Sequence, residues 1–313
     1  MSLTKMANSR TITTLIILVI CLTACSRLFV KVPELPPEAP RGGTLWKEPL
    51  LGLEFVYIAG GYFDMGCGLS VDECSQGSDP RHEVYVDGFW MGRYEVTIEQ
   101  FMRFLDTVKD SDLEERLHIS LEGEGVFKKG YFGRTVIHSY SDLKKMNMTN
   151  HPVSNVSWFG AKALASWLKR KLGYNFRLPT EAEWEYACRG GHSYFEFGTA
   201  TGIWSTSNTA NYTSEKNIYH NVQSFPVGSF PPNPLGLYDL SGNVWEWCED
   251  WFDESFYTYS PVQNPYNSKE GTYRVIRGGA YDSVKKGLRC SFRNKHWPDF
   301  RSRNVGFRLV IAP

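Results

Sequence analysis

Signals for regular secondary structure are sparse in this 313-residue chain, and this restricts the folds open to it more than any other feature. Three segments have the caps and apolar periodicity of helices, and between them lie short β-branched and aromatic runs separated by Gly, Pro and Asn. With 28 Gly, 17 Tyr and 10 Trp, the chain favours a loop-rich core packed largely by aromatic side chains. The pattern predicts the α+β class, with few helices and much irregular structure.

Each predicted helix follows a side chain that can accept a hydrogen bond from a free backbone N–H group. These caps, with the helices after them, are Thr97 (to about residue 108), Ser157 (158–172) and Thr180 (to about residue 189). Residues 82–86 and 273–276 have the composition of short strands.

Composition and charge exclude two broad classes of protein. Hydrophobic residues make up 42% of the chain and aromatic residues 15%, which is too much apolar material for a disordered chain. The 34 basic residues balance the 34 acidic ones, so the chain lacks the positive charge of a nucleic-acid-binding protein. We therefore expect a folded protein with no nucleic-acid partner.

Residues 1–24 have the pattern of a lipoprotein signal peptide. Lys5 and Arg10 precede a short apolar stretch, which ends in Leu-Thr-Ala before Cys25 and resembles a bacterial lipobox. This predicts that Cys25 becomes the new N-terminus and is diacylated through its sulfur, with lipid of the palmitate type anchoring the protein to a membrane. The alternative is an ordinary secretory signal with an incidental Cys. Ser26 favours the outer membrane of a Gram-negative cell envelope, on its periplasmic or surface side.

The remainder divides into a tether and one domain. Residues 25–50 are rich in Pro and read as an extended spacer, whereas residues 51–313 read as a single globular domain. Residues 109–150 are charged, contain several Gly and show no periodicity. They are interpreted as an insertion, which either forms a lid over one surface or is a solvated loop without a role.

Export places the remaining cysteines in an oxidising compartment, where pairs are expected. Five cysteines remain after Cys21 and Cys25, so one stays free: Cys67, Cys74, Cys188, Cys248 and Cys290. Cys67 and Cys74 are close enough in sequence to close a small disulfide loop. The alternative is that they are two ligands of a metal site, although no further Cys or His lies nearby.

Seven segments, taken in order, match one protein family. They are Gly60-Gly-Tyr-Phe-Asp-Met-Gly66, Val86-Asp-Gly-Phe-Trp-Met-Gly-Arg-Tyr-Glu-Val-Thr97, Pro152-Val-Ser-Asn-Val-Ser-Trp158, Arg177-Leu-Pro-Thr-Glu-Ala-Glu-Trp-Glu-Tyr-Ala187, Gly236-Leu-Tyr-Asp-Leu-Ser-Gly-Asn-Val-Trp-Glu-Trp247, Arg277-Gly-Gly279 and Asn304-Val-Gly-Phe-Arg308. In order and spacing they resemble the formylglycine-generating enzyme, or sulfatase-modifying factor, family. The resemblance implies a compact, loop-rich, C-type-lectin-like fold with few helices and short antiparallel strands.

The resemblance also exposes a difference in the catalytic segment. Prototype family members oxidise a substrate Cys to formylglycine with Cu(I) held by two thiolates that follow Arg-Gly-Gly-Ser. Here Ala280 stands at the Ser position, Ser283 at the first Cys and Leu288 at the second. Because Cu(I) prefers soft thiolate donors, these residues argue against copper, and the catalytic residues of this chain stay unassigned.

Two further features are implied by the resemblance. Asp239, Gly242, Val244 and Glu246 match a family Ca²⁺ site built from two side chains and two backbone carbonyls, although they are also ordinary hydrogen-bonding turn residues. The family also pairs the cysteines at positions 188 and 290, which leaves Cys248 as the free thiol.

Candidate ligand-binding residues lie in the C-terminal third of the chain. They are Trp245, Tyr281, Asp282, Arg293, His296 and Trp297. For Trp245 a place in the core is the more common role of such an aromatic residue. The segment from 281 to 297 is equally compatible with a solvated loop of mixed charge.

Two functions remain open on the sequence alone. In the first, an envelope lipoprotein uses the family fold to bind a protein or peptide ligand without the oxidase chemistry. In the second, the chain is a formylglycine-generating or other metal-dependent oxidoreductase that modifies an exported protein or peptide. Fold does not decide between them.

Overall fold

The computed structural model describes residues 36, 40–68, 74–107, 128–131, 134–137, 144–192, 194–204, 210–212 and 223–312. Residues 1–36 and 37–313 are separate units, and the expected signal peptide, Cys25 and most of the spacer lie outside the described residues. Within the described part, no helix has both the length and the apolar character needed to cross a membrane.

The three helices expected from capping residues are present. Their bounds are Ile98–Thr107 for α2, Trp158–Leu172 for α5 and Glu181–Cys188 for α6. Ser157 caps α5, and Gly173 ends it in the left-handed conformation with φ 82°. Both capping boxes form: the one at Thr180 and Glu183, and the one at Thr97 and Gln100. Local hydrogen bonding therefore fixes where each helix begins.

The strands are short and belong mainly to two sheets. One has the order β1-β2-β5-β13-β8 and is antiparallel throughout, with strands Leu45–Lys47, Glu54–Ile58, Phe89–Gly92, Val310–Ala312 and Asn175–Arg177. The other has the order β11-β10-β9-β12, with strands Asn294–His296, Arg274–Arg277, Trp245–Trp251 and Val305–Gly306. In that sheet only β12 runs parallel to its neighbour, β9.

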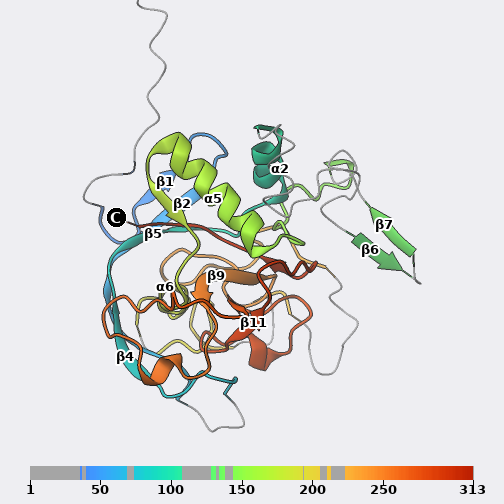
Figure 1. Ribbon diagram of the computed structural model, residues 1–313. Helices are drawn as coiled ribbons and strands as arrows, with labels where there is room; N and C mark the ends of the chain where they lie inside the picture. The colour runs from blue at the N-terminus through green and yellow to red at the C-terminus, as the bar shows by residue number, and fades with distance from the viewer. Residues whose placement is uncertain are drawn as a thin grey trace, which may run out of the picture. The chain divides into compact units, whose positions relative to one another are not determined.

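The five-stranded sheet separates two hydrophobic cores. Along β2, Phe55 packs with α2 and α5, whereas Val56 and Ile58 pack with α6 on the other face. The same alternation appears in β13, where Ile311 and Val310 face opposite cores. A period of two residues is what a strand requires when both of its faces are covered. Figure 1 shows α5 beside β1 and β2, with α2 on the other side of α5 in this view.

The folded domain begins before the expected boundary at residue 51. Strand β1 pairs with β2, and the side chain of Trp46 is buried against Phe55 and Tyr174. A run of three residues with one buried Trp is too short to show a period. The Pro residues before it therefore led to the prediction of an extended spacer up to residue 50.

Two shorter ribbons complete the description. Strands β3 (Gly61–Met65) and β4 (His82–Val86) pair with each other, as do β6 (Lys128–Tyr131) and β7 (Arg134–Ile137). The second ribbon falls inside the expected insertion at 109–150, most of which lies outside the described residues.

Candidate functional site

The segment after β10 forms the turn where the family places its metal-binding thiolates. Gly278 and Gly279 have φ values of 96° and 73°, and a Cβ atom on Gly279 would lie 2.5 Å from Leu288 Cδ2. Only glycine fits that combination of left-handed backbone and close approach. The Arg277 side chain connects the turn to α6, because it is fully buried and donates hydrogen bonds to Glu181 and Glu185.

Ser283 forms two hydrogen bonds with Ala280 in the next turn. Its backbone N–H donates to the Ala280 carbonyl at 2.9 Å, and its Oγ accepts a hydrogen bond from the Ala280 N–H at 3.0 Å. The hydroxyl is therefore used as a local cap in a side-chain-to-backbone turn.

The residue that faces Ser283 is Gly287, not Leu288. A Cβ atom on Gly287 would lie 3.6 Å from Ser283 Cβ and 3.9 Å from Cζ2 of Trp245. Leu288 is completely buried and packs against Gly279. The spacing from the Arg-Gly-Gly motif places the family's second Cys at position 288, and the side chain at that position lies in the core.

These residues do not fit a Cu(I) thiolate centre. The turn offers a hydroxyl at 283, no side chain at 287 and an alkyl group at 288, whereas Cu(I) requires soft sulfur donors. Cys248, the one free thiol among the described residues, is buried in β9, and burial raises its pKa well above the usual range. A buried thiol that resists ionisation is a poor metal ligand or nucleophile.

A second turn, from Asp239 to Glu246, contains the residues of the expected Ca²⁺ site. Asp239 and Asn243 adopt left-handed backbone conformations with φ 59° and 66°. A Cβ atom on Gly242 would lie 2.3 Å from the Asn211 carbonyl oxygen, so this position requires glycine. Asn211 Oδ1 is itself buried and accepts no hydrogen bond from the described residues.

Three buried carboxyl groups belong to or bond with this turn. Glu246 accepts hydrogen bonds from Arg308 Nε and Nη2 at 2.6 Å each, and from Trp184 Nε1 at 2.9 Å. The Asp239 carboxylate accepts from the Gly228 N–H at 2.7 Å. Glu95 accepts from the Asn243 side-chain amide at 2.7 Å and from the Val244 N–H at 3.2 Å.

Glu95 was not identified from the sequence as part of this cluster. It lies within the matched segment 86–97. An acidic residue directly between Tyr94 and Val96 was the signal available in the sequence. Burial raises the pKa of Asp239 to about 6, and burial together with the Asp239 and Glu246 charges raises the pKa of Glu95 well above its usual range. Both shifts arise because negative charges are crowded in a site that water does not reach.

The donor types at this turn are those that a hard divalent cation prefers, and the Ca²⁺ site itself stays a prediction. Among the described residues, Arg308 is the one cation in a salt bridge to any of the three carboxyl groups, and it pairs with Glu246. Carboxylate and carbonyl oxygens are the ligands that Ca²⁺ prefers. Asp239 and Glu246 would supply side-chain oxygens, and Gly242 and Val244 backbone carbonyls.

The six ligand-binding candidates separate into exposed and buried residues. Trp297 is 51% exposed, His296 stacks on Phe300 with ring centroids 3.5 Å apart, and Asp282 accepts two hydrogen bonds from the Asn304 amide at the surface. Trp245 and Tyr281 are buried, and burial raises the pKa of Tyr281 to about 12.

Arg293 does not lie on the ligand-facing surface that was expected for it. Its guanidinium is buried and binds both carboxylate oxygens of Glu181 at 2.7 and 2.8 Å. It also donates to the carbonyls of Gly77 and Asp253. The charge therefore joins the 74–79 loop to α6, and the sequence signal of a basic residue in a polar segment was misleading.

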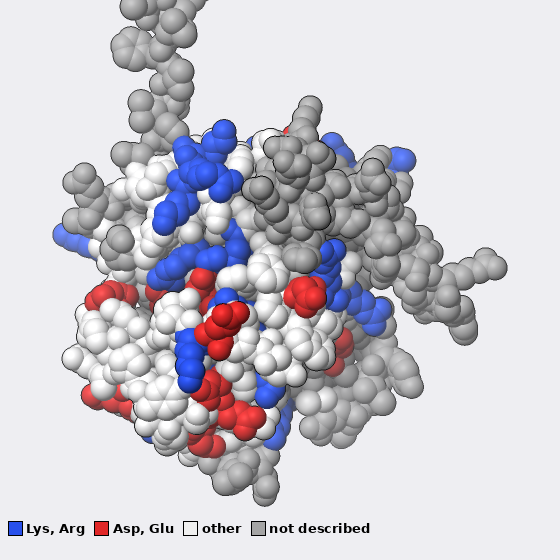
Figure 2. Space-filling model, in the orientation of Figure 1, with Lys and Arg blue, Asp and Glu red and all other residues white. Residues whose placement is uncertain are grey.

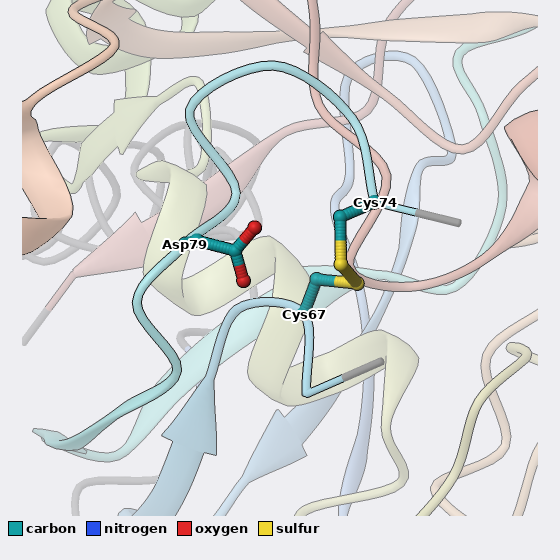
Figure 3. Close-up of side chains that lie close together, drawn as sticks. All are labelled: Cys67, Cys74 and Asp79. Atoms are coloured by element: carbon teal, nitrogen blue, oxygen red, sulfur yellow. A yellow bond between two sulfur atoms is a disulfide. The ribbon is translucent and has the colours of Figure 1, made fainter. Parts of the chain in front are cut away.

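Both expected disulfides are present. Cys188 at the end of α6 bonds to Cys290, and Cys67 bonds to Cys74. Figure 3 shows the Asp79 carboxylate beside the second bond, and the three side chains have ligand atoms within 4.8 Å of one another. The sulfur atoms are bonded to each other, so in this state they close a loop and are not thiolate ligands.

Comparison with known proteins gives the same assignment as the motifs. The family model described as the sulfatase-modifying factor enzyme 1-like domain matches residues 47–313. The chain is 32% identical over 302 residues to the formylglycine-generating enzyme of Mus musculus. The match covers 86% of this chain and 78% of that protein. Its structure resembles that of PvdO from Pseudomonas aeruginosa, with a TM-score of 0.70, 26% identity and coverage of 88% and 100%.

A further similarity is to a longer protein. The chain is 35% identical over 267 residues to the serine/threonine-protein kinase Pkn1 of Chlamydia trachomatis, covering 84% of this chain. It spans about two fifths (39%) of the length of that relative. Since the family model and the mouse enzyme each match more than four fifths of its residues, the chain belongs to the sulfatase-modifying factor family.

Proposed function

We propose that this chain is an exported lipoprotein whose sulfatase-modifying-factor-like domain binds a protein or peptide ligand at the bacterial cell envelope. In this proposal the domain lacks the classical copper–thiolate oxidase chemistry. The relatives named above include an enzyme, but the function of a fold depends on the residues at its site.

One observation carries the proposal: the turn after Arg277 has no sulfur donor. Ser283 is occupied as a cap for Ala280, and the position that faces it is Gly287. Without thiolates the turn has no means of holding Cu(I).

The exposed side chains of the segment from 282 to 300 supply the proposed ligand surface. Trp297 and Asp282 are exposed, and His296 and Phe300 present a stacked pair of rings. Exposed aromatic residues next to fixed polar groups are typical of protein-binding surfaces. We propose that Ca²⁺ at the Asp239–Glu246 turn stiffens the backbone beneath Trp245, and that the lipid on Cys25 keeps this surface at the outer membrane.

The first experiment tests the missing chemistry. The chain from residue 26 onward is incubated with Cu(I), oxygen, Ca²⁺ and a Cys-x-Pro-x-Arg peptide, and mass spectrometry follows conversion of the peptide Cys to formylglycine. We expect no conversion above a Ser283→Ala control. Conversion above that control would refute the proposal and restore an oxidoreductase function.

The second experiment tests binding in the cell. A photo-crosslinking amino acid replaces Trp297 in the full chain, and the same replacement at Tyr194, which is 88% exposed, serves as the matched control. We expect a discrete crosslinked partner from position 297 and none from position 194. Identical products from both positions would contradict a ligand surface at Trp297.

A further inference from the structure

A cavity of about 470 Å³ lies between the ends of α2 and α5 and the loop that follows β1. It is far from the turn after Arg277 in sequence and shares none of its residues. Its lining residues are Leu50, Leu51, Arg103, Asp106, Thr107, Trp167 and Lys171. The cavity therefore combines apolar walls with a charged rim, as sites for amphiphilic ligands do.

Hydrogen bonds hold one cation at the rim. The Arg103 guanidinium donates to the carbonyls of Leu50 and Leu51 at 3.1 and 3.4 Å, while the side chain stays exposed. A planar guanidinium with donors left over is suited to a phosphate oxygen.

The second cation belongs to a basic turn. The last turn of α5 contains Lys169, Arg170 and Lys171, all of them exposed. Cations at a helix C-terminus interact favourably with the helix dipole. Lys171 also lines the cavity, so the basic turn and the cavity form one surface. Figure 2 shows basic side chains gathered over this end of α5 with few acidic ones among them.

The same surface lies where the folded domain begins. Trp46 of β1 packs against Tyr174, two residues beyond the end of α5, with ring centroids 6.2 Å apart. On β1, Leu45 is 57% exposed and Lys47 is exposed. Residues 26–44 would connect this strand to the proposed acyl anchor, at no more than about 3.5 Å per residue.

We propose that this surface docks on anionic phospholipid. Arg103 and Lys171 hold the headgroup phosphate at the rim of the cavity, and the glycerol and first acyl carbons contact Leu50, Leu51 and Trp167. Arg170 and Lys169 lie over neighbouring headgroups. The placement of this surface at a membrane in the cell rests on the proposed lipid anchor, but binding to lipid does not.

Vesicle binding by the unacylated chain from residue 26 tests the charged surface. We expect it to sediment with vesicles of phosphatidylcholine and phosphatidylglycerol, less so at high salt, and not with phosphatidylcholine alone. Each basic residue near an anionic surface raises the vesicle partition coefficient about fivefold. Arg170→Glu with Lys171→Glu should therefore lower the partition coefficient at least about 25-fold. Lys269→Glu with Lys285→Glu, the same charge change at other exposed positions, should reduce it less than about threefold.

Soluble dihexanoyl-phosphatidylglycerol tests the cavity. Thr107 lines it and is exposed, so Thr107→Trp should fill the space and abolish binding of this single lipid in calorimetry. Thr107→Ser keeps the hydroxyl that donates to the Phe104 carbonyl and should bind normally.

Two results would overturn the proposal. One is equal binding to vesicles with and without phosphatidylglycerol. The other is a preference for an acidic polypeptide such as polyglutamate, lost in the Arg170 and Lys171 variant, which would assign the surface to an acidic protein. Neither experiment uses a peptide substrate or the acyl group, so failure here leaves the proposed function to its own tests.

Discussion

At the turn after Arg277, a hydroxyl and a hydrogen atom stand where a pair of thiols would be needed. The backbone nevertheless keeps positions 283 and 287 close, because a Cβ on Gly287 would lie 3.6 Å from Ser283 Cβ. Disulfides require Cβ atoms about 3.5–4.5 Å apart. The absence of a thiol pair is therefore a matter of the side chains, because the backbone still brings two positions within disulfide reach.

This geometry predicts the behaviour of a restored pair. Ser283→Cys with Gly287→Cys should form a disulfide in air and bind one Cu(I) after reduction, measured by thiol titration and a Cu(I) competition assay. Ser283→Cys with Leu288→Cys should keep both introduced thiols free, since Leu288 points into the core. A disulfide in the second variant and none in the first would show that position 288 faces Ser283 after all.

A buried histidine should make stability depend on pH. His151 is 7% exposed with Nδ1 3.2 Å from Ser224 Oγ, and burial lowers its pKa below the usual 6.5. The folded state disfavours the charged imidazole. The contribution of His151 to the free energy of unfolding is therefore complete above pH 6.5, and it is lost as pH falls below that value towards the folded-state pKa. Urea unfolding midpoints should therefore fall less between about pH 7.5 and about pH 5.5 in His151→Gln than in the parent chain. Equal falls would exclude His151 as a source of the pH dependence.

Residues with local roles were predictable, and those with distant partners were not. Ser157 and Thr180 cap helices through bonds to the next turn, which the sequence displays directly. Arg293 and Glu95 act through Glu181 and Asn243, each more than a hundred positions away. No single-sequence pattern shows which distant group will neutralise a buried charge.

Among the elements, the helices were predicted closely and most strands were not. Helix α5 matches the expected bounds of 158–172, because its stripe, cap and terminal Gly all lie within one segment. Strands β1, β12 and β13 have two or three residues each, fewer than a period of two needs to be recognised. Their identity depends on pairing with strands far away in the sequence.

The two disulfides should differ in the stability they provide. Loop-closure entropy predicts about 4.7 kcal/mol for the Cys188–Cys290 bond, which spans 102 residues, and about 2.4 kcal/mol for Cys67–Cys74, which spans 7. Denaturant unfolding of Cys188→Ala with Cys290→Ala should accordingly show the larger loss of unfolding free energy, with Cys67→Ala and Cys74→Ala as the matched pair. A larger loss in the second pair would mean that packing of the 67–74 loop, and not chain entropy, dominates.

For the whole molecule, Ca²⁺ should raise thermal stability. Three carboxyl groups are buried here, and Arg308 forms a salt bridge with Glu246 alone among them. A divalent cation bound at about one hundred times its Kd would contribute about 2.7 kcal/mol and raise Tm by about 5–10 °C over the chelated protein. Mg²⁺ should raise it less, because it gives up its water reluctantly. Glu246→Gln weakens the salt bridge to Arg308 and lowers Tm by itself. The quantity to compare is therefore the rise in Tm on adding Ca²⁺, which should vanish in this variant. A full response in that variant would place any bound Ca²⁺ elsewhere.

The position of β13 has a consequence for the order of folding. Residues 310–312 form the strand between β5 and β8, so these two strands join one sheet only when β13 is in place. Both pairings connect segments far apart in the sequence, and such contacts form slowly because a long loop must close first. A chain truncated before Val310 would therefore leave the facing edges of β5 and β8 unpaired, and unpaired edges favour aggregation.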